Sequence, residues 1–161
     1  MKIAVLSDTH GDEQNVRWLL EQVWKDSGPI DAYLHLGDGV YDFNRLQQFI
    51  RAHDPSAMMF AVRGNCDIGV NDEPETRVVR LGGVGLFMSH GHRYYVKQTY
   101  DYIDRAAQER GCAVALFGHT HVQTMEMRSV LLLNPGSATN DRMALIEIDE
   151  KGDIRPQLIE Y

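Results

Sequence analysis

The side chains best suited to bind a metal ion follow short apolar segments of this 161-residue chain. Each of these segments ends abruptly in polar residues. The candidate ligands are Asp8, His10, Asp38, Asn65, His90, His92, His119 and His121. Any one of them alone is more often a turn former, a helix cap or a hydrogen-bonded structural group. Five of the seven histidines, however, fall in three dense clusters after separate segments, so we interpret the set as a metal site.

The spacing within the clusters favours chelation by neighbouring side chains. In an extended segment, residues i and i+2 point to the same side, so one metal ion can take both. The pairs with this spacing are Asp8–His10, His90–His92 and His119–His121. Mixed imidazole and carboxylate ligation suits Mn, Fe, Zn, Ni or Co better than Mg or Ca. No cluster of cysteines is present, which argues against a structural zinc site.

Five apolar segments are predicted to be buried strands that position these residues, because each is short, continuous and followed by a polar loop. They span residues 3–6, 32–36, 57–62, 84–88 and 113–117. Glycines that allow sharp turns lie in the loops, at positions 11, 37, 64, 91 and 118. Ligands of open α/β sheets bind outside the carboxyl ends of the strands, so we expect the candidate residues to meet there.

Helical periodicity appears between the predicted strands, over residues 16–24, 43–50 and 96–110. Strands that alternate with helices predict right-handed βαβ units and a largely parallel sheet. After His121, short segments with tight turns at 122–128, 130–133, 143–148 and 154–160 are typical of antiparallel strands. We therefore expect a second sheet packed on the first, with helices outside.

Length and composition predict one soluble globular domain over residues 1–161, without a linker or repeat. The net charge of −7 opposes contact with a phosphate backbone, so we expect no nucleic-acid-binding surface. The apolar runs are too short for a signal peptide or a membrane span, which predicts a cytoplasmic protein without a membrane partner. Cys66 and Cys112 are widely separated, which excludes a disulfide framework.

The order of the candidate residues along the chain resembles the calcineurin-like metallophosphoesterases. The matching motifs are Asp8-x-His10, Gly37-Asp38, Gly64-Asn65, Ser89-His90-Gly91-His92 and Gly118-His119-x-His121. The short chain and Asn134-Pro135-Gly136-Ser137 resemble the small bacterial and archaeal phosphodiesterase branch, which includes Vps29. The resemblance covers essentially the whole chain. It implies an α/β fold, a four-layer αββα sandwich of two mixed β-sheets with flanking helices, and a homodimer.

The resemblance further implies a site for two divalent metal ions. Asp8, His10 and His121 would bind one ion, Asn65, His90 and His119 the other, and Asp38 would bridge them. A carboxylate suits this position because its oxygens can hold two cations about 3.5–4 Å apart. Two such cations outweigh the charges of the two carboxylates and leave a cationic pocket that attracts phosphate. His92 would lie nearby and face the phosphate, so Asp38, Asn65 and His92 are the predicted catalytic residues.

These features predict a metal-dependent phosphodiesterase in which a water or hydroxide activated by the metal pair attacks a small phosphate ester. Mn²⁺ is the ion that we expect, and no nucleophile from the protein is required. Two alternatives are a non-catalytic Vps29-like scaffold for protein interactions and a phosphomonoesterase. All seven ligand positions hold competent residues, which favours an enzyme. The motifs do not choose among esters, because the metal ions contact the phosphate and not the rest of the substrate.

Cys66 departs from the pattern of the better-known phosphatases of the superfamily. Those enzymes carry a histidine here that protonates the leaving oxygen, a contribution of about 10²–10⁴-fold. A thiol beside two cations loses its proton readily and returns one poorly, so we expect the usual general acid to be missing, with His92 as a partial substitute. The alternative is that Cys66 is a small residue buried beneath the loop.

The two remaining histidines are interpreted as structural. We expect His35, which lies inside an apolar strand, to be buried and hydrogen-bonded. His53 precedes Asp54-Pro55 and is expected to contact the last carbonyl groups of its helix.

Overall fold

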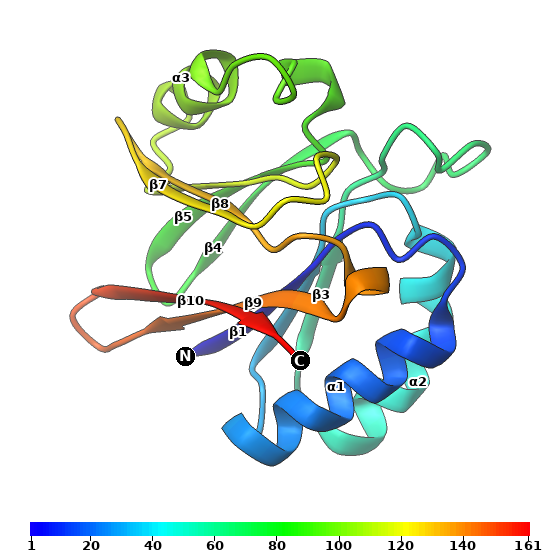
Figure 1. Cartoon of the computed structure of the whole chain (residues 1–161). Helices are drawn as coiled ribbons and strands as arrows, with labels where there is room; N and C mark the ends of the chain where they lie inside the picture. The colour runs from blue at the N-terminus through cyan, green and yellow to red at the C-terminus, as the bar shows by residue number, and fades with distance from the viewer.

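A computed structural model describes residues 1–161, which form two five-stranded sheets packed face to face (Figure 1). The strands are β1 (Lys2–Leu6), β2 (Ala32–His35), β3 (Met58–Ala61), β4 (Thr76–Leu81), β5 (Val84–Ser89), β6 (Val114–Leu116), β7 (Thr124–Met127), β8 (Leu131–Asn134), β9 (Arg142–Ile148) and β10 (Ile154–Glu160). The strand order is β10-β9-β1-β2-β3 in the first sheet and β4-β5-β6-β8-β7 in the second. The expected fold of two mixed sheets flanked by helices is confirmed.

Helices cover the outer face of each sheet (Figure 1). Helices α1 (Glu13–Ser27) and α2 (Val40–His53) pack on the first sheet, and α3 (Asp101–Glu109) packs on the second. Two short 3₁₀ helices, η1 (His92–Tyr94) and η2 (Ala138–Asn140), follow β5 and β8. None of the helices combines the length and the apolar run that crossing a membrane requires.

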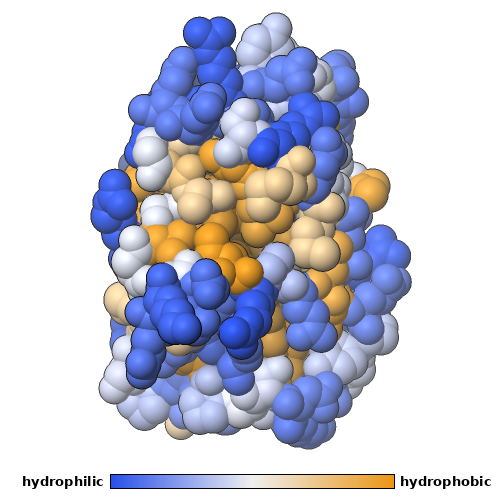
Figure 2. All heavy atoms as spheres, turned by 90° about the vertical axis from the view of Figure 1, so that its left-hand side faces the viewer, coloured by the Kyte–Doolittle hydropathy of each residue, from blue (hydrophilic) through white to orange (hydrophobic).

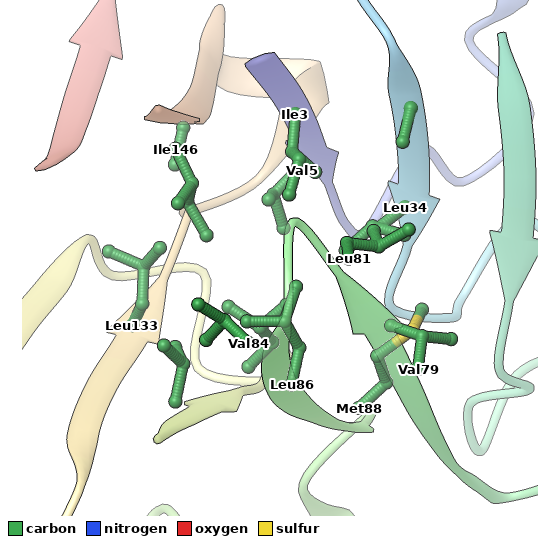
Figure 3. Packing of buried hydrophobic residues seen from close by; sticks show 14 of the residues in the cluster. Ile3, Val5, Leu34, Val79, Leu81, Val84, Leu86, Met88, Leu133 and Ile146 are labelled. Carbon is green, nitrogen blue, oxygen red and sulfur yellow. The ribbon is translucent and has the colours of Figure 1, made fainter. Parts of the chain in front are cut away.

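Strands β1 and β2 are buried on both faces because the first sheet separates two apolar layers. Ile3 and Val5 of β1 point toward the second sheet, where they pack in a cluster that includes Leu86 (Figure 3). Ala4 and Leu6 point the other way, toward α1 and α2. This alternation follows the two-residue period of a strand. On the side that faces left in Figure 1, apolar side chains also reach the surface as a band bordered by hydrophilic residues (Figure 2).

The four C-terminal strands do not form one antiparallel sheet, contrary to the expectation. Strands β7 and β8 complete the second sheet, in which β8 is parallel to β6. Strand β9 extends the first sheet antiparallel to β1, and β10 pairs antiparallel with β9. Strand β4, which the sequence pattern did not predict, forms the edge of the second sheet. Local alternation shows that a segment is a strand, but hydrogen bonds to distant segments decide which sheet it joins.

The third helix is shorter than predicted, because it begins at Asp101 and not near Val96. Tyr95 has a left-handed backbone with φ of 52°, which interrupts any regular helix at this point. Val96 is nevertheless buried, in the cluster beneath α3. The apolar spacing of this segment therefore reflects the packing of a turn as well as that of a helix.

Candidate metal centre

The loops that follow five strands meet at one edge of the sandwich. They carry Asp8 and His10 after β1, Asp38 after β2, Asn65 after β3, His90 and His92 after β5, and His119 and His121 after β6. Backbone hydrogen bonds join the loops: the Asp8 N–H donates to Gly37 O at 3.0 Å, and the Gly118 N–H donates to His90 O at 3.0 Å. The meeting of the candidate residues at the carboxyl ends of the strands agrees with the topology.

Asp8, His10 and His121 form the first group, which we call the open cluster. His121 Nε2 lies 3.1 Å from Asp8 Oδ1 and 3.3 Å from His10 Nε2. The distance from His10 Nε2 to Asp8 Oδ1 is 3.8 Å. The side chains of His10 and His121 are 33% and 44% exposed, whereas that of Asp8 is fully buried. The open cluster is therefore a buried carboxylate capped by two solvent-exposed imidazole rings.

Asp38, His90 and His119 form the second group, which we call the closed cluster. His90 Nε2 lies 3.2 Å from Asp38 Oδ2, and these side chains are 0% and 4% exposed. On the other side of the ring, His90 Nδ1 is 2.9 Å from Leu36 O. Donation from Nδ1–H to this carbonyl group holds the ring so that Nε2 faces the cluster, as in many histidines that bind metal ions.

Asp38 also lies within reach of the open cluster. The candidate ligand atoms of His10, Asp38 and Cys66 all lie within 4.8 Å of one another. Those of Asp38, His90 and His119 in the closed cluster meet the same limit. The Cys66 N–H donates to Asp38 Oδ1 at 2.7 Å, which leaves Oδ2 beside His90. Asp38 is thus the carboxylate that lies near ligand atoms of both clusters.

Two buried polar atoms between the clusters make no hydrogen bond, although Asp38 Oδ2 lies 3.2 Å from one of them and His121 Nε2 lies 3.1 Å from the other. They are Asp8 Oδ1 and His90 Nε2, which lie 4.0 Å apart. Buried polar atoms are nearly always paired, so two such atoms that face each other require an explanation. A carboxylate oxygen and an imidazole nitrogen are both ligands of divalent transition metals. The donor set therefore fits a divalent cation in this position.

The charges of the closed cluster suit cation binding at neutral pH. Burial alone would raise the pKa of Asp38, but the facing His90 ring and the Cys66 N–H outweigh it and hold the pKa well below its usual value. Burial lowers the pKa of His119 to about 4, and the nearby His90 adds to this effect. At pH 7 Asp38 is therefore an anion and His119 is neutral, which are the forms that bind metal ions.

Left-handed backbone orients the side chains of the pairs Asp8–His10 and His119–His121, which corrects the argument from strand alternation. Five candidate residues have positive φ: Asp8 (55°), His10 (44°), Asp38 (56°), His119 (68°) and His121 (60°). Such a conformation costs a non-glycine residue roughly 1–2 kcal/mol and is concentrated at functional sites. Asp8 and His10 enter the same cluster, as the spacing predicted, but His119 and His121 enter different clusters, so that spacing does not place both rings on one ion.

Gly64 and Gly118 have roles that differ from the predicted one. Neither has positive φ, so the chain does not need them for a sharp turn. A Cβ atom at Gly64 would lie 2.1 Å from Asp38 Oδ1, and one at Gly118 would lie 1.9 Å from Ser7 Oγ and 2.6 Å from Asp8 Oδ2. Only glycine leaves room for the two carboxylates at these positions.

Asp67 organises the loop around Asp38, a role that the sequence analysis missed. It is buried, and its carboxylate accepts hydrogen bonds from four backbone N–H groups. The donors are Asp38 (2.8 Å), Gly39 (2.8 Å), Val40 (2.9 Å) and Gly64 (2.7 Å). The only signal in the sequence is an acidic residue directly after Gly64-Asn65-Cys66, and that signal does not identify its partners.

Asn134 and Ser137 support the open cluster from the C-terminal half of the chain. The Asn134 side chain donates to Gly118 O and to Thr120 Oγ1, both at 2.9 Å, and so holds the loop that carries His121. Ser137 Oγ donates to Asp8 O at 2.8 Å. The Asn-Pro-Gly-Ser segment noted in the sequence thus fixes the backbone of two site loops.

Asn65, Cys66 and His92 lie at the rim of the site. Asn65 Nδ2 is 3.2 Å from Cys66 Sγ, and both residues are exposed. The alternative that Cys66 is buried beneath the loop is therefore wrong. The His92 ring lies 5.5 Å from that of His90 between centroids, and its Nδ1 is buried without a hydrogen-bond partner. Burial and the nearby His90 lower the pKa of His92.

The other two histidines lie outside the site. His35 is buried, and its Nδ1 accepts a hydrogen bond from the Gly37 N–H at 3.2 Å, as predicted. His53 does not contact the helix carbonyl groups. Its ring stacks on Trp24 with 4.1 Å between centroids, and Nδ1 is 3.0 Å from Asp54 Oδ1. Stacking on Trp24 and the contact with Asp54 thus take the place of the expected contact with the helix end.

Comparison with known proteins relates the chain to phosphoesterases. Residues 1–151 match the family described as the calcineurin-like phosphoesterase superfamily domain. The chain is 30% identical over 148 residues to a probable metallophosphoesterase of Bacillus subtilis, YsnB, with 91% of this chain and 80% of the relative covered. It is 28% identical over 150 residues to the phosphodiesterase MJ0936 of Methanocaldococcus jannaschii, with 84% and 83% covered.

The fold is similar to that of a solved structure of Vps29 from Entamoeba histolytica in complex with zinc. The TM-score is 0.73, the identity is 20%, and 99% of this chain and 98% of the other are covered. At this identity the similarity concerns the arrangement of the elements alone.

Proposed function

The chain belongs to the calcineurin-like phosphoesterase superfamily, and from this premise we propose that it is a metal-dependent phosphodiesterase with a site for two divalent cations. The observation that carries the proposal is the pair of buried, unpartnered atoms Asp8 Oδ1 and His90 Nε2, each of which belongs to a separate ligand cluster. A structural site would pair these atoms with each other or with backbone groups.

Seven residues would hold the cations. Asp8, His10 and His121 would bind one, Asn65, His90 and His119 the other, and Asp38 would lie between them. Two divalent cations held by these residues would supply Lewis-acid polarisation of a phosphoryl group and a lowered pKa for a bound water. Imidazole-rich ligation favours Mn²⁺ over Mg²⁺. Asn65 completes the set as an amide oxygen donor next to Asp38.

The surrounding residues fix the charge and the orientation of these ligands. Asp8 Oδ2 accepts hydrogen bonds from Ser7 Oγ at 2.6 Å and from the His119 N–H at 3.1 Å, which directs Oδ1 toward the centre. The contact with Leu36 O does the same for His90 Nε2. Asp8 and His90 are therefore each held by a partner on the far side, which reduces the reorganisation required for binding.

Protonation of the leaving group is the weak step of this site. Contrary to the expectation that the thiol loses its proton, the Asp38 carboxylate and burial raise the pKa of Cys66 and make the thiol a weaker acid. Burial lowers the pKa of His92, so its imidazole is neutral at pH 7. Neither group is then a good acid for an alkoxide. We propose that aryl esters, whose leaving groups need no proton, are cleaved much faster than alkyl esters.

The preference for diesters is supported by the relative MJ0936, which is described as a phosphodiesterase. The test is hydrolysis of bis(p-nitrophenyl) phosphate and of p-nitrophenyl phosphate by purified protein with Mn²⁺, Zn²⁺, Ni²⁺, Co²⁺ or Mg²⁺. We expect faster cleavage of the diester. Faster cleavage of the monoester would identify a phosphomonoesterase, and no cleavage with any metal would favour a non-catalytic scaffold.

A further inference from the structure

A shallow groove runs from the rim of the metal centre along the loop that follows β3. Asn65 and His92 line it, together with Arg63, Glu75 and Arg93. The groove is therefore continuous with the place where a substrate phosphate would bind. The two arginines come from different loops, Arg63 after β3 and Arg93 in η1 directly after His92.

The two guanidinium groups share one oxygen of a single carboxylate. Arg93 Nη2 lies 2.7 Å from Glu75 Oε1, and Arg63 Nη2 lies 3.5 Å from the same atom. The other carboxylate in the groove is that of Asp67, whose oxygens are occupied by backbone N–H groups. Glu75 is thus the one carboxylate that pairs with either guanidinium group, and the two groups share it.

The arginines are held in place but still accessible. The Arg63 backbone N–H donates to Pro74 O at 2.9 Å, and its Nη1 donates to Val70 O at 3.1 Å. The Arg93 side chain is 63% exposed and retains donors that Glu75 does not use. The two guanidinium groups repel each other, and an anion bound beside them in addition to Glu75 would offset this repulsion. Guanidinium groups bind phosphate through two parallel hydrogen bonds.

We propose that Arg93 and Arg63 form a subsite for a second phosphate of the substrate, so that the preferred substrates are diesters that carry an additional phosphate group. The inference rests on the proposed phosphodiesterase function and adds the substrate class to it. Glu75 is the positioning residue that keeps the two guanidinium groups together until the second phosphate binds.

The experiment compares two chromogenic diesters that differ only in the second phosphate: the p-nitrophenyl ester of thymidine 5′-phosphate and its 3′-phosphorylated form. With Mn²⁺-loaded protein we expect kcat/KM to be about tenfold higher for the 3′-phosphorylated form, which is the effect of one charge-assisted contact. Arg93→Ala brings the ratio to about one. The matched control is Arg105→Ala, an exposed arginine on α3 that pairs with Glu109, and it keeps the ratio of the unaltered protein.

Binding is measured in parallel by calorimetry with thymidine 5′-phosphate and thymidine 3′,5′-bisphosphate, so that the subsite is tested without turnover. Equal kcat/KM values for the two diesters in the unaltered protein, or a preference that survives in Arg93→Ala, overturn the subsite and leave the proposed function intact. If neither diester is cleaved, the proposed function fails. The subsite then fails as well unless Arg93→Ala weakens binding of the bisphosphate selectively.

Discussion

The open and closed clusters use the same types of side chain in different surroundings. In the closed cluster, the His90 ring is fully buried and held at Nδ1 by Leu36 O. In the open cluster, the rings of His10 and His121 are exposed, and each has the other as its nearest polar neighbour besides Asp8. The closed cluster therefore holds His90 in a fixed orientation, whereas the exposed rings of the open cluster have no such backbone partner. The two clusters should thus respond differently to the same change.

Removal of metal affects both clusters and should have the largest effect. We expect protein stripped with a chelator to lose its phosphodiester hydrolysis and to recover it with Mn²⁺ more fully than with Mg²⁺, because the ligands include imidazoles. The measurement is the rate on bis(p-nitrophenyl) phosphate at each metal concentration. Equal rates in chelator and in Mn²⁺ would reject a metal mechanism.

Asp38→Asn should nearly abolish turnover, because it removes the negative charge that lies near both clusters while it changes the volume very little. A loss of several kcal/mol of transition-state stabilisation corresponds to a decrease of about 10³-fold in kcat. The rate is read together with the metal content and the circular dichroism of the variant. A near-normal rate with two metal ions bound would show that Asp38 is not shared by the clusters.

His90→Ala and His121→Ala test the difference between the clusters directly. We expect His90→Ala to weaken metal binding about tenfold more than His121→Ala does, because the removed ring was fixed in its binding orientation. In metal-free protein, His90→Ala should also lower the free energy of unfolding by about 2 kcal/mol, and His121→Ala by less than about 0.5 kcal/mol. Titration with Mn²⁺ and denaturant unfolding measure the two effects. Equal losses in both variants would remove the distinction between an open and a closed cluster.

His35 is buried against Phe43 and accepts a hydrogen bond from the Gly37 N–H, so its replacement should act on stability. Burial lowers the pKa of His35 to about 4, against about 6.5 when unfolded, so the neutral ring stabilises the fold above pH 6.5 and this contribution is lost as the pH falls toward 4. His35→Asn should reduce the free energy of unfolding by about 1–3 kcal/mol at pH 7 and weaken its decline between pH 6.5 and 4. Urea unfolding at several pH values provides the measurement. An unchanged pH profile would show that His35 does not titrate in this range.

Cys66→Ala should have the smallest effect. Cys66 contacts Asp38 through its backbone N–H, which alanine keeps. On an activated aryl diester we expect a rate within about twofold of that of the unaltered protein, because such a leaving group needs no acid. A hundredfold loss of rate in Cys66→Ala, with both metal ions retained, would show that the thiol takes part in the reaction.

Much of the site was readable from the sequence because its residues follow strands that short apolar runs reveal. Strand ends in an α/β sheet meet at one edge, so the order of the polar residues after β1, β2, β3, β5 and β6 was enough to predict that they gather. The chemistry of imidazole and carboxylate then pointed to a metal ion. These inferences depend on residue type and on local periodicity, which the chain carries in any context.

Other features were decided only by tertiary structure. Strand β9 joins β1 and not the second sheet, a choice made by hydrogen bonds between segments more than 130 residues apart. The four N–H groups around Asp67 and the carboxylate shared by Arg63 and Arg93 also come from separate loops. No local pattern encodes such contacts, because the free energy of each depends on where the rest of the chain has already packed.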